Sequence, residues 1–391
     1  VANSCRFNFA DGAYLTKTFG ASGNQKTFTL SNWIKRSRLG DLVMLYGGAG
    51  ADAVYFTTSD ELLVICGSGS DDRRQSTMKF RDVGAWYHIV LKFDTTQGTA
   101  ADRYTLYVNG TEAATPVVSG KNEITEDLDI DLFYDSASYI GFDGSSDYFD
   151  GYMAETVHID GTALAASSFG EFDEDSPTIW KPKDVSGLTF GTNGFYLDYE
   201  DSGDLGDDES GNTNDFTETN IAATDQATDT PTNNFATMNP LAAYYSASTF
   251  SEGNLKVVTG SSAYTYDISN IGVASGKWYW EFKYTAAGGD PHNVGHFGIS
   301  GKGMSTANSH SLGYYSTDYG ISADSGGTLY NNNSGTTNSL YNVAIGDILG
   351  FALDLDSGTK TLKFYRNGTE KITTNISSSP ESGAYFPAFG F

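Results

Sequence analysis

Short runs in which apolar and polar residues alternate recur along the whole chain, and turn-forming residues separate them. The run from Trp86 to Asp94 is followed by a turn-rich segment, by a second run from Arg103 to Val108 and by the pair Asn109-Gly110. Alternation with a period of two is the pattern of a β-strand that rests one face on a core. This part of the chain is therefore predicted to consist of strands joined by turns.

The same order of strand, turn, strand and Asn-Gly returns near the end of the chain, over residues 347–356, 360–366 and the pair Asn367-Gly368. The six residues that begin at Tyr107 and the six that begin at Tyr365 share five letters. Asn-Gly favours a type I′ hairpin turn because both central residues need a positive φ angle. The repeated feature is predicted to be a strand meander. A duplicated ligand-binding loop is the alternative, although a tight turn leaves little room for a ligand.

Composition supports a protein of many short strands. The chain has 391 residues, with 45 Gly, 25 Tyr and 24 Phe against 5 Met. Aromatic residues favour strands, and Gly favours turns. The length fits two domains of roughly 100–200 residues each. We predict an all-β protein with two domains.

Acidic residues are concentrated in the middle of the sequence. The formal net charge is −26, and residues 183–238 alone carry 12 acidic side chains and 1 basic side chain. Nucleic acids and anionic membrane surfaces need basic faces. Neither is expected as a partner, and no run reaches the roughly 18–20 apolar residues of a membrane helix. The balance suits divalent cations.

Cys5 and Cys66 are the only cysteines of the chain. Two thiolates are too few for a Cys-based zinc site. One disulfide and two buried thiols are both compatible with the sequence.

Several motifs follow one another over residues 1–182: Cys5-Arg-Phe-Asn-Phe, Asp11-Gly-Ala-Tyr-Leu, Phe28-Thr-Leu-Ser-Asn-Trp-Ile-Lys, Trp86-Tyr-His-Ile-Val, Leu106-Tyr-Val-Asn-Gly, Tyr139-Ile-Gly and Phe149-Asp-Gly-Tyr-Met-Ala-Glu. In this order they resemble a laminin-G-like domain of the concanavalin-A-like class. The resemblance implies an antiparallel β-sandwich of jelly-roll type over residues 1–182.

A second set of motifs lies in residues 239–391: Gly276-Lys-Trp-Tyr-Trp-Glu-Phe, Gly295-His-Phe-Gly-Ile, Asp347-Ile-Leu-Gly-Phe-Ala-Leu-Asp and Leu362-Lys-Phe-Tyr-Arg-Asn-Gly. They resemble a SPRY domain, which is also a concanavalin-A-like sandwich. The family continues past the motif that ends at Phe391, so the last strand is expected to be missing. An open sheet edge at that point would suit a partner strand.

Residues 183–238 are expected to form an acidic connector, whose first part packs on the first sandwich through a strand from Phe195 to Tyr199. A pair of such domains with such a connector resembles proteins encoded by marine phages. The resemblance implies a virion-surface or extracellular protein, such as a tail fibre, a receptor-binding protein or a capsid-attached adhesin. It also implies a homo-oligomer, with a trimer as one form, that contacts other virion proteins and binds a host-surface glycan.

No catalytic motif is present. Asp127, Asp129 and Asp131 alternate with apolar residues, which would place three carboxylates on one face of a strand, but laminarinase-type hydrolases carry glutamates at both catalytic positions. His88 is expected to be a structural core histidine. His292, His296 and His310 have no diagnostic metal-binding spacing. The protein is therefore predicted not to be an enzyme, with a polysaccharide hydrolase as an alternative.

Calcium is the one cofactor that the sequence suggests. Laminin-G-like domains often bind it at a rim of loops, through carboxylate and carbonyl oxygens. The candidate ligands are Asp143, Asp147 and Asp150 in one loop, and Asp207, Asp208, Asn212 and Asn214 in the connector. Solvated turn residues are the alternative for both groups.

Tyrosines near Gly- and Asn-rich loops are the candidate ligand-binding residues of the second sandwich: Tyr314, Tyr315, Tyr319, Tyr330 and Asn332. A tyrosine ring offers a rigid face with a polar tip, which suits sugars and peptides. Inward-facing core residues are the alternative. We thus predict two concanavalin-A-like sandwiches that recognise glycans, or else a structural decoration or filament subunit whose loops contact neighbouring subunits.

Overall fold

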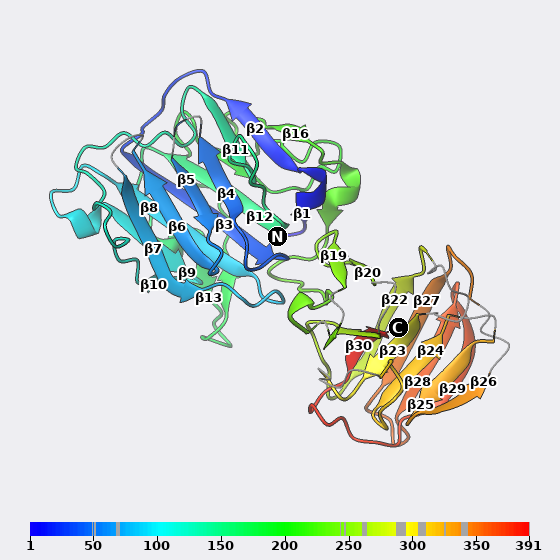
Figure 1. Cartoon of the computed structure of the whole chain (residues 1–391). Coiled ribbons are helices and arrows are strands. Elements are labelled where there is room, and N and C mark those ends of the chain that lie inside the picture. The colour runs from blue at the N-terminus through cyan, green and yellow to red at the C-terminus, as the bar shows by residue number, and fades with distance from the viewer. Residues whose placement is uncertain are drawn as a thin grey trace. The chain divides into compact units, whose positions relative to one another are not determined.

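The computed structural model describes residues 1–48, 50, 52–67, 71–242, 244–245, 248–259, 264–286, 295–303, 310–323, 326–337 and 343–390 (Figure 1). The chain divides into two compact units: unit 1 is Val1–Phe235 with Ser251–Gly253, and unit 2 is Ala236–Phe250 with Asn254–Phe391. Strands dominate both units, which confirms the predicted all-β fold. Helix in the described residues is limited to short 3-10 turns at Phe9–Asp11, Ala100–Asp102, Ala166–Ser168, Ala223–Asp225 and Pro240–Ala242. None of the helices in this part of the chain is long and apolar enough to cross a membrane.

Unit 1 contains two large antiparallel sheets. Sheet A has eight strands in the order β10-β9-β8-β3-β12-β1-β17, with β15 paired to β12. Its strands are β1 Ser4–Phe7, β3 Thr27–Arg36, β8 Tyr87–Asp94, β9 Tyr104–Val108, β10 Thr111–Ala113, β12 Gly151–Asp160, β15 Phe195–Leu197 and β17 Gln226–Ala227.

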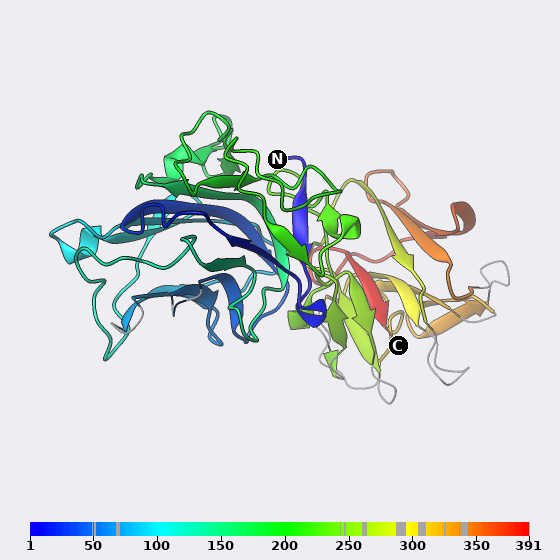
Figure 2. The same ribbon diagram turned by 90° about the horizontal axis from the view of Figure 1, so that it is seen from above.

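Sheet B has seven strands in the order β16-β2-β11-β4-β5-β6-β7. Its strands are β2 Tyr14–Thr18, β4 Val43–Gly48, β5 Ala53–Phe56, β6 Glu61–Cys66, β7 Asp72–Lys79, β11 Ala137–Ile140 and β16 Thr217–Thr219. Seen from above, the two sheets of unit 1 form separate layers (Figure 2).

The main core of unit 1 lies between these sheets. Successive side chains of β3 alternate, so that Phe28, Leu30 and Ile34 are buried in this core. Phe28 stacks on Phe93 of β8, with ring centroids 4.6 Å apart. Each such large side chain stabilises the fold by roughly 1.5–3 kcal/mol through burial. Cys5 and Cys66 are also buried here, as thiols rather than as a disulfide.

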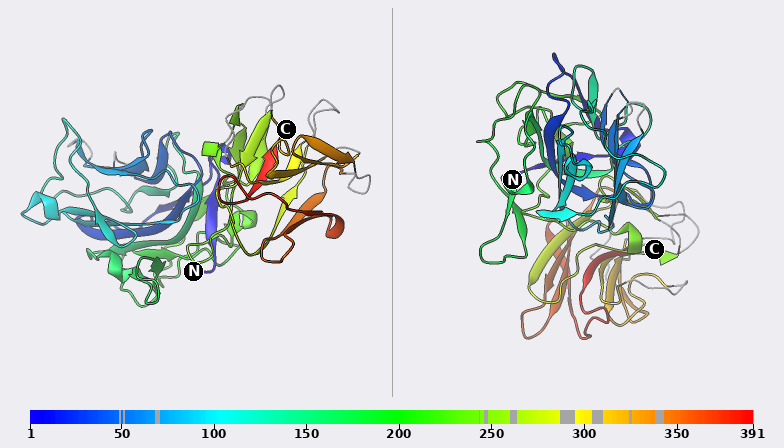
Figure 3. Two further views of the ribbon diagram at one scale, coloured as in Figure 1. Left: turned by 90° about the horizontal axis from the view of Figure 1, so that it is seen from below. Right: turned by 90° about the vertical axis from the view of Figure 1, so that its left-hand side faces the viewer.

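The outer face of sheet A is covered by residues that follow β12. A second apolar cluster joins Val90 of β8 and Val157 of β12 to Phe169, Val185 and Phe190. The short strands β13 Gly170–Phe172 and β14 Trp180–Pro182 belong to this cover. It appears as the green segment outside sheet A in Figures 2 and 3. Both faces of sheet A are therefore buried, unlike those of a simple half-exposed sheet.

Residues 183–235 lie within unit 1, so the packing that was expected for the first part of the connector extends to residue 235. The expected strand is β15, which pairs with β12. β16 and β17 extend sheets B and A. The acidic segment thus supplies three strands to the first sandwich, and it does not form a separate linker.

A buried ion pair holds the end of this segment. The ammonium group of Lys35 donates hydrogen bonds to Asp229 Oδ2 (2.7 Å), Asn234 Oδ1 (2.8 Å) and the carbonyl oxygen of Phe235 (2.8 Å). The indole N–H of Trp86 donates to Asp229 Oδ1 at 2.9 Å. Burial lowers the pKa of Lys35, although Asp229 opposes this shift. Removal of either partner would leave a buried charge uncompensated.

Unit 2 also contains two antiparallel sheets. The larger has the order β18-β21-β30-β23-β24-β25-β26, and the smaller has the order β22-β27-β28-β29. The larger sheet comprises β18 Tyr244–Tyr245, β21 Thr265–Ile268, β23 His296–Ser300, β24 Asp318–Ser322, β25 Thr328–Asn331, β26 Ser334–Thr337 and β30 Phe386–Gly390. The smaller comprises β22 Lys277–Lys283, β27 Ile348–Asp354, β28 Thr361–Arg366 and β29 Thr369–Asn375. A separate ribbon pairs β19 Thr249–Ser251 with β20 Lys256–Val258.

The core of unit 2 lies between its two sheets, where Ile299 and Ile321 meet Phe351 and Phe364. β30 has a partner on each side, β21 and β23. The open edge that was expected beside Phe391 is therefore not at the last described strand, because β30 lies inside its sheet. The edges of this sheet are β18 and β26.

Candidate functional site

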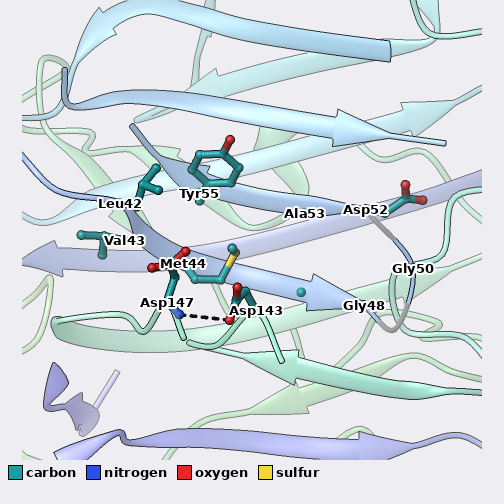
Figure 4. A pocket seen from close by; sticks show the side chains of 11 residues that line it. Leu42, Val43, Met44, Gly48, Gly50, Asp52, Ala53, Tyr55, Asp143 and Asp147 are labelled. Atoms are coloured by element: carbon teal, nitrogen blue, oxygen red, sulfur yellow. Dashed lines mark hydrogen bonds between the residues drawn. The ribbon is translucent and has the colours of Figure 1, made fainter. Parts of the chain in front are cut away.

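A pocket of about 260 Å³ lies on the outer face of sheet B, where β4, β5 and the loop of residues 141–148 meet (Figure 4). We call it the sheet B pocket. Its described lining residues are Leu42, Val43, Met44, Gly47, Gly48, Gly50, Asp52, Ala53, Tyr55, Asp143 and Asp147.

Strand geometry explains which side chains line this pocket. In β5, Val54 and Phe56 belong to the core, so the alternate residues Ala53 and Tyr55 face outward. In β4, a bulge between Met44 and Tyr46 changes the register against β5. Val43 and Leu45 face the core, so Met44 between them faces outward, opposite Tyr55 (Figure 4), while the bulge turns Tyr46 into the core after Leu45.

Two glycines of β4 let other backbone segments lie close against the strand. A Cβ atom on Gly47 would lie 2.5 Å from the carbonyl oxygen of Phe142, and one on Gly48 would lie 2.0 Å from that of Asp131. Real Cβ atoms do not approach this closely, so only Gly fits at these positions. Gly47 thus lets residues 141–148 reach the edge of the pocket, and Gly48 admits the backbone of Asp131 beside them.

Asp143 organises this loop. Its Oδ1 accepts hydrogen bonds from the amides of Ser145 (2.7 Å), Ser146 (2.8 Å) and Asp147 (3.0 Å). Burial raises the pKa of Asp143, but these hydrogen bonds outweigh it, and the pKa lies below its usual value. The pKa of Asp147 is raised by burial and by the charges of Asp143 and Asp41.

Asp52 is the third carboxylate of the pocket. Its Oδ2 accepts a hydrogen bond from the amide of Asp131 at 2.6 Å. Burial raises its pKa to about 6, despite that hydrogen bond. None of the described lining residues is basic, so the pocket presents oxygen acceptors without a compensating cation.

A row of aromatic rings lies beside the pocket on the same loop and sheet. Tyr14 stacks on Phe142 and Phe142 stacks on Tyr148, each with ring centroids 4.5 Å apart. Tyr139 meets Tyr14 edge to face at 5.9 Å, and its ring lies against Gly144 of the loop. The three tyrosines are partly exposed. Aromatic faces beside oxygen acceptors form a surface suited to a polyhydroxylated ligand.

Of the three candidate calcium ligands in this loop, Asp143 and Asp147 lie in the sheet B pocket. Asp150 does not join Asp143 and Asp147, because it directly precedes β12 and is 9% exposed. Burial raises its pKa to about 7, while the nearby Arg38 opposes the shift. It is a buried acid that the structure keeps away from the pocket.

The predicted cluster in the acidic segment is engaged in its own loop. The carboxylate of Asp208 accepts hydrogen bonds from the amides of Tyr196, Ser210 and Asn214 and from the hydroxyl of Ser210. Asn212 and Asn214 donate their side-chain amides to backbone carbonyls at residues 191–194. Burial and neighbouring acids raise the pKa of Asp207. These contacts fold the loop, and calcium at either cluster stays a prediction.

No group of three or more His, Cys, Asp or Glu side chains that could hold a metal ion is found within the described ranges of the chain. His292 lies outside the described residues. His296 stacks on Tyr330 and its Nδ1 lies 2.8 Å from the carbonyl oxygen of Leu312. His310 stacks on Tyr314.

The expected strand at residues 127–131 is wrong. Asp127 has a φ of 58° and lies in a turn, and residues 126–132 form a loop. Ile130 and Leu132 are nevertheless buried in the core, while the aspartates lie outside it. The alternation therefore marks a loop that is anchored by apolar side chains, because backbone pairing with a neighbouring strand is missing here.

The predicted tyrosines of unit 2 divide into two groups. Tyr319 in β24 is 2% exposed and belongs to the core, and its hydroxyl accepts a hydrogen bond from the amide of Ser377. It cannot present its ring to a ligand, so it is removed from the candidate residues.

The other four lie close together. Tyr314 and Tyr315 pack edge to face with centroids 5.4 Å apart, and Lys302 Nζ lies 5.1 Å from the ring of Tyr315. The amide of Asn332 donates to the carbonyl oxygen of Tyr315 at 3.2 Å. Tyr330 lies against Gly313, since a Cβ atom added to Gly313 would lie 2.5 Å from the Cβ atom of Tyr330. The Tyr-rich loop and the turn at Asn332 therefore form one surface.

The predicted role of His88 is confirmed. It is 1% exposed, and its Nε2 lies 2.9 Å from Ser31 Oγ. Burial lowers its pKa to about 3. It is a neutral histidine of the fold.

Sequence reasoning missed Leu42, Met44, Asp52 and Tyr55. They come together only through the pairing of β4 with β5 and the approach of residues 141–148, which are distant in sequence. The Gly47-Gly48 pair within an apolar strand was the available signal, because glycines inside a strand mark a close backbone approach.

Comparisons with known proteins fit this architecture. Residues 9–167 match the model of the concanavalin A-like lectin/glucanases superfamily, and residues 277–391 match the SPRY domain model. The chain thus carries a laminin-G-type domain near its N-terminus and a SPRY domain at its C-terminus. No curated protein matches the sequence.

Among solved structures, the SPRY domain of human HERC1 is 22% identical, with 39% of this chain and 89% of that chain covered and a TM-score of 0.32. Domains LG4-5 of the mouse laminin alpha1 chain are 11% identical, with 100% of this chain and 82% of that chain covered and a TM-score of 0.32. A Bacteroides ovatus protein provisionally described as carbohydrate-binding is 18% identical, with 57% and 59% covered and a TM-score of 0.40.

Proposed function

We propose that the protein is a non-catalytic recognition protein that binds carbohydrate, with the sheet B pocket as its primary site. One observation carries this proposal: the pocket lies wholly within residues 9–167, which match the superfamily of concanavalin A-like lectins and glucanases. The ligand class named in the description of that superfamily therefore agrees with a pocket of unit 1 that carries carboxylates and a tyrosine ring.

The chemistry of the pocket supports the same ligand class. Sugar hydroxyls need fixed acceptors, which Asp143 and Asp147 supply, and sugar C–H faces pack on aromatic rings such as Tyr55. Asp143 is held by three amide donors, so its position is fixed before a ligand arrives. Such preorganisation reduces the entropy that binding costs.

The biological setting of this proposal is the surface of a phage virion, where the chain acts as a tail-fibre, receptor-binding or capsid-attached adhesin on host-surface glycans. The domain pair and its acidic middle segment support this setting. A homo-oligomer, with a trimer as one form, goes with it. Electron microscopy of the native particle tests both: a projecting multimer supports the adhesin, and a flat lattice of subunits supports a structural decoration protein instead.

A polysaccharide hydrolase is the second candidate, and one observation favours it. The pKa values of Asp143 and Asp147 are shifted in opposite directions within one pocket, and Asp52 has a pKa of about 6. Carboxyl groups whose pKa values are pushed apart can divide acid and base roles. Release of reducing ends from a polysaccharide that the protein binds would establish this activity, and its absence over a pH range of 4–8 would exclude it for that polysaccharide.

Glycan-array screening of the full chain, followed by calorimetry on each hit, tests the binding proposal. Asp147→Asn removes one charged acceptor and should weaken binding about 10-fold, since a hydrogen bond to a charged group contributes roughly 1.5 kcal/mol or more. Tyr55→Ala should weaken it about 3- to 10-fold. Asp102→Asn, an exposed substitution of the same charge change that lines neither pocket of unit 1, is the matched control. Equal affinities for all four proteins would overturn the pocket assignment.

A further inference from the structure

The outer face of sheet A holds a second pocket that differs in character from the sheet B pocket. It has a volume of about 400 Å³ and brings together three of the chain's five tryptophans, Trp33, Trp86 and Trp180. We call it the tryptophan pocket. Its other lining residues are Val108, Asn109, Thr111, Phe172, Thr178, Pro231 and Asn234.

The walls of this pocket are fixed by hydrogen bonds and stacking. His88 lies between Trp33 and Trp180, with ring centroids 4.6 Å and 6.0 Å away and interplanar angles of 19° and 24°. The indole N–H of Trp180 donates to His88 Nδ1 at 2.9 Å. That bond makes Nδ1 an acceptor, so the proton of the neutral ring is on Nε2, which faces Ser31 Oγ.

Two glycines lie against the indole ring of Trp180. A Cβ atom on Gly110 would lie 2.4 Å from the indole ring, and one on Gly170 would lie 2.5 Å from it. Phe172 meets the same indole edge to face at 4.9 Å and is itself 46% exposed. The pocket therefore has a fixed indole wall and an open phenyl face at its rim.

The lining of the tryptophan pocket is uncharged. Its polar side chains are two amides and two hydroxyls, from Asn109, Asn234, Thr111 and Thr178, in a protein with a net charge of −26. The nearest buried charges, Lys35 and Asp229, are paired with each other at 2.7 Å. An ionic ligand would find no partner here, whereas a neutral ligand with many hydroxyls would find both hydrogen-bonding groups and ring faces.

We infer that the tryptophan pocket is a second carbohydrate site, which takes an uncharged sugar ring of a glycan, while the sheet B pocket supplies carboxylates. This inference rests on the proposed function for its ligand class, and it adds a second subsite on the opposite sheet of unit 1. A ring packs on Phe172 and its hydroxyls bond to Thr178 and Thr111. Because the two pockets lie on the outer faces of opposite sheets, they would bind two separate glycan chains and could crosslink them.

Calorimetry on the full chain tests the inference with two probe sets: the neutral hexasaccharides of cellulose, laminarin, amylose and mannan, and the acidic probes 3′-sialyllactose and oligogalacturonate. Phe172→Ala removes the open ring, and Thr178→Trp, at an exposed position, fills the entrance. Tyr55→Ala is the matched variant of the sheet B pocket. We expect at least one neutral probe to bind about 3- to 10-fold more weakly to Phe172→Ala and not at all to Thr178→Trp, with no change in Tyr55→Ala.

The other results separate the two proposals. Neutral or acidic probes whose binding is lost in Tyr55→Ala but unchanged in Phe172→Ala and Thr178→Trp would overturn the second site and leave the proposed function intact. Binding of the uncharged apolar dye Nile red that Thr178→Trp blocks, without any sugar binding there, would identify a hydrophobic pocket and also overturn it. Absence of binding for every probe would overturn both proposals for these sugars.

Discussion

The two Asn-Gly hairpins offer a direct comparison between the units. In both, the turn residues have positive φ angles, 48° and 77° at Asn109 and Gly110, and 49° and 75° at Asn367 and Gly368. In both, the Asn side-chain oxygen accepts a hydrogen bond from the amide of a residue in the neighbouring strand, His88 at 2.8 Å or Ile348 at 2.9 Å.

The surroundings of the two turns differ completely. Gly110 lies against the indole of Trp180, whereas a Cβ atom on Gly368 would meet nothing within 4 Å. The comparison teaches that the repeated Asn-Gly sequence specifies the local turn, because the turn in each unit needs two residues that tolerate a positive φ angle. In unit 1, the segment that covers sheet A makes the Asn109-Gly110 turn part of the tryptophan pocket. The Asn-Gly turn is therefore not a duplicated ligand-binding loop.

The largest difference in stability is expected when the turn glycines are replaced by alanine. Gly110→Ala should lower the free energy of unfolding of unit 1 by about 3 kcal/mol, because a left-handed φ and a collision with Trp180 add together. Gly368→Ala should lower that of unit 2 by about 1 kcal/mol, from the φ angle alone. Denaturant titration read by hydrogen-exchange mass spectrometry follows each unit separately. Equal effects would show that the contact with Trp180 contributes nothing.

The next expected difference is in how stability depends on pH. The residue whose amide donates to the turn asparagine is the ionisable His88 in the first hairpin and Ile348 in the second. The pKa of His88 is about 3 in the folded state against about 6.5 when unfolded. Between these values only the unfolded state takes the proton, so stability is complete above pH 6.5 and falls as the pH drops. At pH 4.5 the loss that His88 contributes is about 3 kcal/mol.

His88→Gln provides the control for this effect. Its unit 1 should lose less stability than the wild type between pH 7.5 and pH 4.5, when unfolding is measured by urea titration at each pH. NMR titration of the His88 ring in the folded protein checks the cause. A folded pKa near 6.5 would contradict the account.

The turn asparagines should give a smaller and more even effect. Asn109→Ala and Asn367→Ala each remove one acceptor from a strand amide and should each cost about 1–2 kcal/mol. Asn367 also donates to Asp347 Oδ1 at 2.7 Å, so its loss should additionally raise the pKa of Asp347. Urea titration measures the first effect and carboxyl NMR the second. A stability loss confined to one of the two variants would show that the turns are not equivalent.

The smallest effect is expected from the glutamates that follow the turns. Glu370 pairs with Lys363 at 2.9 Å on an exposed strand face, and Glu112 occupies the matching position. Exposed ion pairs contribute little. Glu112→Gln should leave the melting temperature of unit 1 unchanged, and Glu370→Gln should lower that of unit 2 only slightly in low salt. A large drop for either variant in calorimetry would mean that these faces are covered in solution.

The fold could be predicted from the sequence because its strands are short, alternating and bounded by turns. β8, β9, β27 and β28 begin and end close to the expected positions. The acidic segment was harder to interpret, since its charge suggested a linker. Its apolar residues Phe195, Leu205 and Phe216 are buried in the core of unit 1, and such anchors outweigh surrounding exposed carboxylates.

The candidate sites could be predicted only in part. Asp143 and Asp147 were found because their loop is local in sequence, while Tyr55 and Met44 join them only through long-range strand pairing. The Gly- and Tyr-rich sequence around Tyr319 favours a binding loop, but β24 turns its ring into the core. The three tryptophans of the second pocket are 53 and 94 residues apart in sequence, counting from Trp33 to Trp86 and from Trp86 to Trp180, so no local pattern could join them.

A crystal structure of the full chain with an oligosaccharide selected on the glycan array tests the central claim most directly. The account predicts a sugar in the sheet B pocket, with hydroxyls bonded to Asp143 or Asp147 and a ring face on Tyr55. A sugar bound only at the Tyr314–Tyr315 loop of unit 2, with the sheet B pocket empty at saturating ligand, would contradict it.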